Sequence, residues 1–258
     1  MVYKEYLPAP ELRQWVECYW KFVVPPNNAT PVTPFEHVYP PEGACSLLFV
    51  KVPAIHYQGI FFAGPSTQVH EVNVFPDSIN VGIRLKPGYA ACLNPINPGA
   101  ILNSSLPITE PLQWQTNFLN SLTVDFDSPQ ILDDLLFQYC APITINPDER
   151  IIKAVNLIIK NAGDISLTGL CDQCFLGERQ LQRLFIKHTG VGIKQFCQIR
   201  RLRQAVVDLY VQRRPWAEMV VERGFTDQAH FYKSFRNVAA YKLDRFLNHI
   251  DLIDHHLI

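Results

Sequence analysis

Basic and amide side chains recur at helical spacing between Glu178 and Gly190. Arg179, Gln182, Arg183 and Lys187 fall on one face of a predicted helix, and apolar side chains fall on the other. Arginine can donate two hydrogen bonds to O6 and N7 of guanine, and glutamine can pair with N6 and N7 of adenine. A helix surface of ion-paired residues would place acidic side chains four residues from the basic ones. This face has no acidic residue beyond Glu178. The pattern therefore favours a helix that reads bases over a salt-bridged surface helix.

A second stretch of the same kind follows. Pro215 is predicted to begin a helix that ends at Arg223, Gly224 makes the turn, and residues 227–236 form a second candidate recognition helix. This helix would bury two phenylalanines. It would expose five candidate DNA-binding residues, namely Gln228, Ala229, Tyr232, Lys233 and Arg236.

These two helices need elements that position them. A short helix over residues 167–172 and a few turn residues precede the first, which is the arrangement of a helix-turn-helix unit. Apolar residues at helical spacing over residues 196–209 predict one long amphipathic helix between the units. Successive major-groove segments lie about 34 Å apart on one side of B-DNA, so a rigid connector would hold the helices at a useful separation.

The preceding half of the chain has a different character. Nineteen of the twenty prolines lie at or before Pro147, and short β-branched and aromatic runs over residues 45–52, 55–63, 69–75 and 79–85 predict strands. Two predicted helices, beginning near Pro111 and Pro129, follow them. We therefore expect an α+β chain: a strand-rich domain with two C-terminal helices over residues 1–145, and an all-α domain with two helix-turn-helix units over residues 146–258.

Charge divides along the same line. Residues 1–147 hold six Lys or Arg against twelve Asp or Glu, whereas residues 179–245 hold fourteen against five, a net charge of +9. A localised basic region is typical of phosphate contact, and double-stranded DNA is the expected partner. Seven scattered cysteines predict reduced thiols. With no basic-apolar leader and no apolar run of about 18 residues, we expect a cytoplasmic protein with no membrane partner.

At this point the sequence resembles the AraC family of transcription regulators. The resemblance covers residues 148–247 and rests on ERQLQRLFIKHTG (178–190), RRLRQA (200–205) and RGFTDQAHFYKSFR (223–236). It implies base contacts by Arg179, Gln182 and Arg183 in the first unit. In the second unit it implies base contacts by Gln228, Ala229, Tyr232 and Lys233, with phosphate contacts at helix ends and flanking basic residues.

The chain departs from the family pattern at several packing positions. Phe175 and Gly177 stand where the family has a turn glycine and a serine cap, and Ile193, Ala240 and Leu243 alter the segments after each unit. Replacing a capping hydroxyl by glycine costs only a few tenths of a kcal/mol, so the helix is expected to form. The altered positions bear on DNA affinity and geometry more than on the class of function.

The N-terminal half also resembles a domain that is often fused ahead of this helix pair. YPPEGACSLLF (39–49) and VGIRLKPGYAACL (81–93) carry the resemblance. In the wider family the upstream domain is commonly a cupin-like β-barrel that senses a small molecule and dimerises. The resemblance thus implies a small-molecule effector, a homodimer and contact with RNA polymerase.

Other residues that could do chemistry have plainer interpretations. Cys171 and Cys174 form a C-x-x-C pair, but no second ligand pair follows, so we expect core thiols. His37, His56 and His70 show no H-x-H pairing, and no metal or cofactor is expected. Two basic residues of the acidic domain could bind an anionic effector or form structural ion pairs; they are Arg84 and Lys86.

Three functions remain open from sequence. The first is a sequence-specific regulator controlled by an effector in the N-terminal domain. The second is a constitutive regulator whose N-terminal domain only dimerises, and the third is a helical module that binds protein. An enzyme is not expected, because the chain has no phosphate-binding loop and no nucleophile elbow. Activation and repression are not distinguished by these patterns.

Overall fold

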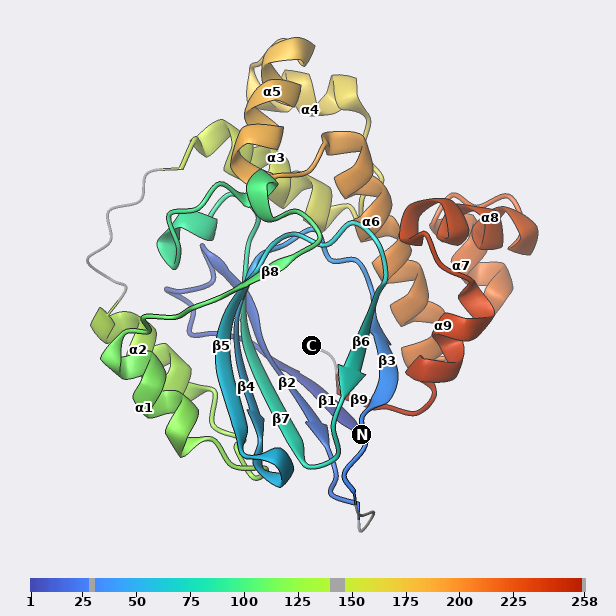
Figure 1. Cartoon of the computed structure of the whole chain (residues 1–258). Helices are drawn as coiled ribbons and strands as arrows, with labels where there is room; N and C mark the ends of the chain where they lie inside the picture. The colour runs from blue at the N-terminus through green and yellow to red at the C-terminus, as the bar shows by residue number, and fades with distance from the viewer. Residues whose placement is uncertain (28–30, 140–146, 257–258) are drawn as a thin grey trace.

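A seven-stranded sheet forms the centre of the N-terminal part, in the strand order β8-β5-β4-β7-β2-β1-β9 (Figure 1). The computed structural model describes residues 1–27, 31–139 and 147–256. Neighbouring strands are antiparallel except for β1 and β9, which are parallel. The strands are β1 (Val2–Tyr6), β2 (Val16–Val24), β4 (Ser46–Val52), β5 (Tyr57–Ala63), β7 (Ser78–Leu85), β8 (Ser105–Pro107) and β9 (Asp254–His256).

One face of this sheet is covered by two helices, α1 (Gln113–Ser121) and α2 (Gln130–Tyr139), as Figure 1 shows. Strand residues alternate between the two faces, so one set of side chains meets these helices. Phe49 packs edge-on against Phe118, with ring centroids 4.8 Å apart, and both are buried. The apolar core of the N-terminal part lies between this face and the two helices.

The other face of the sheet is partly covered by a separate two-stranded antiparallel sheet, β3 (Phe35–Tyr39) with β6 (His70–Val74), which we call the β3–β6 sheet. His37 of β3 stacks on Phe22 of β2, with ring centroids 5.1 Å apart. Trp20 stands opposite Gly82 in the register, where a Cβ would lie 2.2 Å from the indole. Glycine at this position is therefore required by the close approach of the indole ring.

Helices form the C-terminal part, and they pack around two apolar cores. The α-helices are α3 (Glu149–Lys160), α4 (Leu167–Cys174), α5 (Glu178–Thr189), α6 (Ile193–Val206), α7 (Trp216–Glu222), α8 (Gln228–Ala239) and α9 (Leu243–Ile250). Short helical turns complete the chain, namely η1 (Pro53–Ile55), η2 (Ala90–Cys92), η3 (Pro98–Ile101) and η4 (Val207–Val211). The α6 helix runs from the α3–α5 group to the α7–α9 group (Figure 1), which is the placement expected for a connector.

The expected fold class, a strand-rich domain followed by a helical one, is confirmed. The four runs predicted as strands match β4, β5, β6 and β7 to within two residues at each end, and the predicted connector becomes α6 continued by the π-helical turn η4. The predicted boundary between residues 145 and 146 lies outside the described residues. After α9 the chain returns to the sheet, and β9 pairs with β1. No described helix has the length and apolar character needed to cross a membrane.

Candidate nucleic-acid interface

The first helix-turn-helix unit consists of α4, a tight turn and α5. Ser166 caps α4 by accepting a hydrogen bond from the Gly169 N–H, 3.0 Å away. The turn contains Phe175 at a φ of 54°, in the left-handed region that glycine adopts most easily. Gly177 then stands at the N-cap of α5 without a side chain to cap it. The two helices share one apolar core through Leu170, Leu181 and other buried residues.

The predicted base-reading face of α5 is open to solvent. Arg179, Gln182, Arg183 and Lys187 are all exposed. Gln182 is within 3.2 Å of the Glu178 carboxylate, one turn earlier. The structure thus brings these four side chains onto one accessible face.

The second unit consists of α7, a turn at Gly224 and α8. Asp227 caps α8 by accepting a hydrogen bond from the His230 N–H, 2.7 Å away. The exposed predicted residues of this helix are Gln228, Ala229, Lys233 and Arg236. Tyr232 is half-buried, and its ring stacks against Trp216 at a centroid distance of 6.5 Å. The tyrosine ring therefore lies partly in the core of the unit and partly on the predicted DNA-binding face.

A buried acid ties the connector to the second unit. Asp208 in η4 is fully buried and pairs with Arg223, whose Nε lies 2.7 Å away. Gln204 also donates a hydrogen bond to the Asp208 carboxylate, at 2.9 Å. A buried charge is stable only when it is paired and hydrogen-bonded, as this one is. The contact between η4 and the segment that follows α7 is thereby fixed.

One candidate phosphate contact was not assigned from sequence. Lys194, in the first turn of α6, is exposed and lines a surface groove of about 750 Å³ together with Gln182 of α5. Arg201 lines the same groove. Lys194 belongs to α6 and not to α5, so the helical periodicity of the α5 face does not identify it.

The two candidate effector residues lie in different surroundings. Arg84 is 3% exposed and is bound between Glu5, 2.9 Å away, and Glu42. This geometry is that of a structural ion pair, the alternative interpretation from sequence. Lys86 is half-buried, and burial lowers the pKa of its ammonium group.

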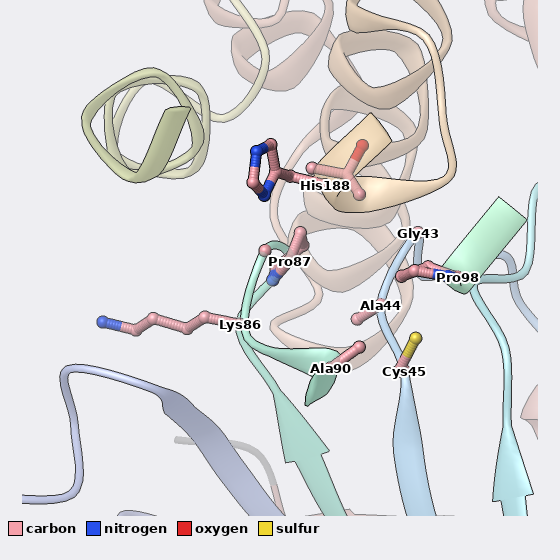
Figure 2. Close-up of a pocket in the computed structure, with 10 residues that line it drawn as sticks. Gly43, Ala44, Cys45, Lys86, Pro87, Ala90, Pro98 and His188 are labelled. Carbon is pink, nitrogen blue, oxygen red and sulfur yellow. The ribbon is translucent and has the colours of Figure 1, made fainter. Parts of the chain in front are cut away.

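Lys86 belongs to a seam between the end of α5 and the N-terminal part (Figure 2). His188 lies above the loop at Pro87, and Cys45 and Ala90 lie below it, whereas the Lys86 side chain extends away from the group. The seam leaves no space for a water molecule. It is a packed contact between the two parts rather than a cavity for a ligand.

Cys171 and Cys174 both belong to α4, whereas His37 and His70 belong to β3 and β6. Cys174 is buried in the core of the first unit, and Cys171 is half-buried. Burial raises the pKa of both thiols. Within the described residues, no group of three or more His, Cys, Asp or Glu side chains is arranged to hold a metal ion.

Two family models match the chain. A helix-turn-helix domain matches residues 170–248, which run from within α4 to within α9, and a domain of unknown function (DUF6597) matches residues 4–107. Residues 170–248 form an AraC-type helix-turn-helix domain. The AraC-type domain is a DNA-binding domain of transcription regulators. The two exposed faces described above, on α5 and α8, both lie within it. No curated protein matches the chain.

The chain is similar to solved structures of ToxT and of the C-terminal domain of AraT. ToxT from Vibrio cholerae is 8% identical, with a TM-score of 0.45 over 96% of this chain and 99% of its own. The C-terminal domain of AraT, a response regulator from Geobacillus stearothermophilus, is 16% identical, with a TM-score of 0.35 over 39% of this chain and 85% of its own. A ToxT structure bound to an unsaturated fatty acid is 10% identical, with a TM-score of 0.42 over 86% and 96% of the two chains.

Proposed function

We propose that this chain is a sequence-specific DNA-binding transcription regulator that inserts α5 and α8 into two segments of the major groove. One observation carries the proposal: each unit of the AraC-type domain presents an exposed face of long hydrogen-bonding and basic side chains. Side chains of these types match the donor and acceptor pattern of base edges. The residues proposed to contact DNA are Arg179, Gln182, Arg183, Lys187, Gln228, Ala229, Tyr232, Lys233 and Arg236, with Lys194 as a further phosphate contact.

The test is enrichment of duplexes from a random-sequence library by the full chain, followed by titration at rising salt. Neutralised phosphates release counterions, so log affinity should fall linearly with log salt, with a slope of about −0.9 per phosphate contact. A helical module that binds only protein would enrich no duplex. Enrichment without a shared sequence, or affinity that does not change with salt, would also contradict the proposal.

We further propose that a small molecule bound to the N-terminal domain controls this activity. Support comes from the sheet face opposite α1 and α2. Tyr3, Trp20 and Phe61 are half-buried there, and two buried polar atoms, Trp20 Nε1 and Ser78 Oγ, have no hydrogen-bond partner among the described residues. Half-buried aromatic rings and unsatisfied donors suit a ligand that stacks and forms hydrogen bonds.

Thermal unfolding with a metabolite library tests this second proposal. A ligand that binds only the folded chain stabilises it by RT ln(1 + [L]/Kd), so an effector should raise the melting temperature. Substituting Ser78 by alanine should reduce that shift. If no metabolite shifts the melting temperature, a constitutive regulator whose N-terminal domain only dimerises is favoured. A homodimer and contact with RNA polymerase remain predictions.

A further inference from the structure

We propose that the N-terminal part fixes the relative position of the two recognition helices, by holding the α6 connector and the C-terminal end of each recognition helix. The inference rests on the proposed DNA-binding function and adds to it. It specifies what sets the separation between the two DNA segments. We call the three contacts described below the clamp.

The first contact of the clamp joins α6 to the sheet by buried ion pairs. Arg200 is 6% exposed and forms a two-pronged pair with Glu17 of β2, in which one N–O distance is 2.9 Å. Arg203, one turn further along α6, pairs with Glu5 of β1 at 2.8 Å. Glu5 also binds Arg84 of β7. Two adjacent turns of the connector are thus bound directly to β1 and β2, and through Glu5 to β7.

These ion pairs keep their charges at neutral pH. Burial alone would raise the pKa of Glu17, but Arg200, with help from Arg84 and Arg203, outweighs burial and lowers the pKa to about 2. The pKa of Glu5 is also lowered, because Arg84 and Arg203 outweigh its burial. Two-pronged arginine–carboxylate pairs constrain orientation as well as distance. The contacts with the sheet therefore fix the rotation of α6 about its own axis.

The second contact lies at the C-terminal end of α5. Gly190 ends this helix at a φ of 76°, and a Cβ on it would lie 2.8 Å from the backbone nitrogen of Gly99. The helix end and η3 of the N-terminal part therefore meet backbone to backbone. Thr189 and Pro98 belong to the closed seam shown in Figure 2.

The third contact lies at the C-terminal end of α8. The Val69 N–H donates a hydrogen bond to the Ala239 carbonyl, at 2.8 Å, and Val38 and Val69 belong to the apolar core of the second unit. Arg245 of α9 pairs with Glu36 of β3 and, at 3.2 Å, with Glu71 of β6. The β3–β6 sheet, together with Val69 just before it, thus contributes both apolar and ionic contacts to the second unit.

The position of the clamp explains what it can control. It holds the C-terminal ends of α5 and α8, whereas Arg179 and Gln228, near their N-terminal ends, are exposed. The two units can move relative to each other only if at least one contact breaks. One added base pair moves a DNA segment by about 3.4 Å and rotates it by about 36°, so one fixed arrangement suits one separation.

Binding to duplexes with varied separation tests the clamp. Duplexes enriched by the full chain define two recognised segments, and base pairs are then inserted or removed between them one at a time. The wild-type chain should bind one separation best and lose about tenfold or more in affinity at one base pair either side, because the second unit no longer engages.

The double variant Arg200→Gln with Glu17→Gln removes both charges together, which avoids leaving one buried charge unpaired. Its affinity should vary less than about threefold over the same separations.

A matched control lies on the same helix. Arg201 pairs with Asp164 at 3.3 Å, within the C-terminal part, so Arg201→Gln with Asp164→Asn removes an ion pair without touching the clamp. This variant should keep the sharp preference of the wild type. Arg245→Gln removes the exposed pairs of the third contact and should also broaden the preference.

Each outcome decides the inference. Thermal unfolding shows whether each variant is folded, and if the Arg200 and Glu17 variant is not, the Arg245→Gln profile decides alone. Profiles as sharp as that of the wild type in the folded clamp variants would overturn the inference while DNA binding stands. A profile broadened equally in the Arg201 and Asp164 control would also overturn it. If no duplex is enriched at all, the proposed function fails and the inference fails with it.

Discussion

Arg183 lies in the middle of α5, exposed and one residue from Gln182, where a planar donor can reach a guanine edge. Arg183→Ala should lower the affinity for the enriched sequence by about 1–3 kcal/mol and relax the preference at one or two adjacent base pairs. Gel-shift titration and a repeated selection measure the two effects. If the selected consensus stays unchanged in Arg183→Ala but changes in Lys233→Ala, the second unit is the main reader.

Lys187 lies one turn further, near the C-terminal end of α5, and is exposed. A flexible ammonium at a helix end suits a phosphate better than a base edge. Lys187→Ala should therefore weaken binding to all sequences alike and reduce the salt slope by about one unit. A variant with a changed consensus and an unchanged slope would assign Lys187 to a base instead.

Phe175 combines strain with exposure. Its φ is 54° and its side chain is 87% exposed, with the Lys153 ammonium 5.4 Å from the ring centroid. A left-handed backbone costs a residue with a Cβ about 1–2 kcal/mol, and the cation–π contact at an exposed site returns about 0.5–1 kcal/mol. Phe175→Gly should raise the free energy of unfolding by up to about 1 kcal/mol in urea denaturation. Phe175→Ala, which keeps the strain and loses the ring, should lower it.

The predictability of single residues depended on how near in sequence their partners lie. The exposed face of α5 follows from helical periodicity, because all of its residues belong to one helix. The pairing of Arg84 does not, because Glu5 and Glu42 lie 79 and 42 residues away in sequence. Only the folded sheet brings these three side chains together.

At the scale of elements, the two recognition helices differ in how they begin. Asp227 caps α8, whereas Gly177 leaves α5 without a side-chain cap. Gly177 has a φ of −67°, and a Cβ there would meet nothing within 4 Å. Gly177→Ser should therefore raise the free energy of unfolding by about 0.5–1 kcal/mol, from the added cap and from the lower entropy of the unfolded chain.

The control for this variant is Gly177→Ala, which restricts the unfolded chain equally but supplies no hydroxyl. Urea denaturation of both variants separates the two contributions. If serine and alanine stabilise equally, the hydroxyl forms no cap and the first turn of α5 does not need one.

Elements were predicted where a periodic pattern was long enough to detect. The strands β4 and β7 have seven and eight residues, and buried residues dominate both, so their sequences are distinctive. Strand β9 has three residues, of which Asp254 and His256 are exposed. Its pairing with β1 joins the two ends of the chain, and a polar tripeptide carries no local signal for such a contact.

At the scale of the whole molecule, the basic window predicted from sequence serves two purposes. Arg200, Arg203 and Arg245 lie inside it, yet each pairs with a carboxylate of the acidic N-terminal part. Their charges are used within the chain and are not free for phosphates. The charge asymmetry therefore reflects attraction between the two parts of the molecule as well as the proposed DNA contact.

His37 links the β3–β6 sheet to the C-terminal segment and should make stability depend on pH. It is 6% exposed, stacks on Phe22 and meets the edge of the His249 ring at 5.6 Å. Burial lowers its pKa to about 4, and the nearby His249, His255 and chain N-terminus add to the effect. In the unfolded chain its pKa is near 6.5, so the unfolded state binds more protons between these two values.

The free energy of unfolding should accordingly be highest above pH 6.5 and fall as the solution is acidified toward pH 4, by about 3 kcal/mol from this group. The Glu17–Arg200 pair loses its contribution in a lower window, between about pH 4.5 and pH 2, so the two effects are separable.

Urea denaturation at pH 7.5, 6.0 and 5.0 measures the first window alone. In His37→Gln, which stays neutral throughout, stability should fall less between pH 7.5 and pH 5.0 than in the wild type. An equal fall in both proteins would mean that the histidine charges freely in the folded chain, and that the β3–β6 sheet does not bury it against α9.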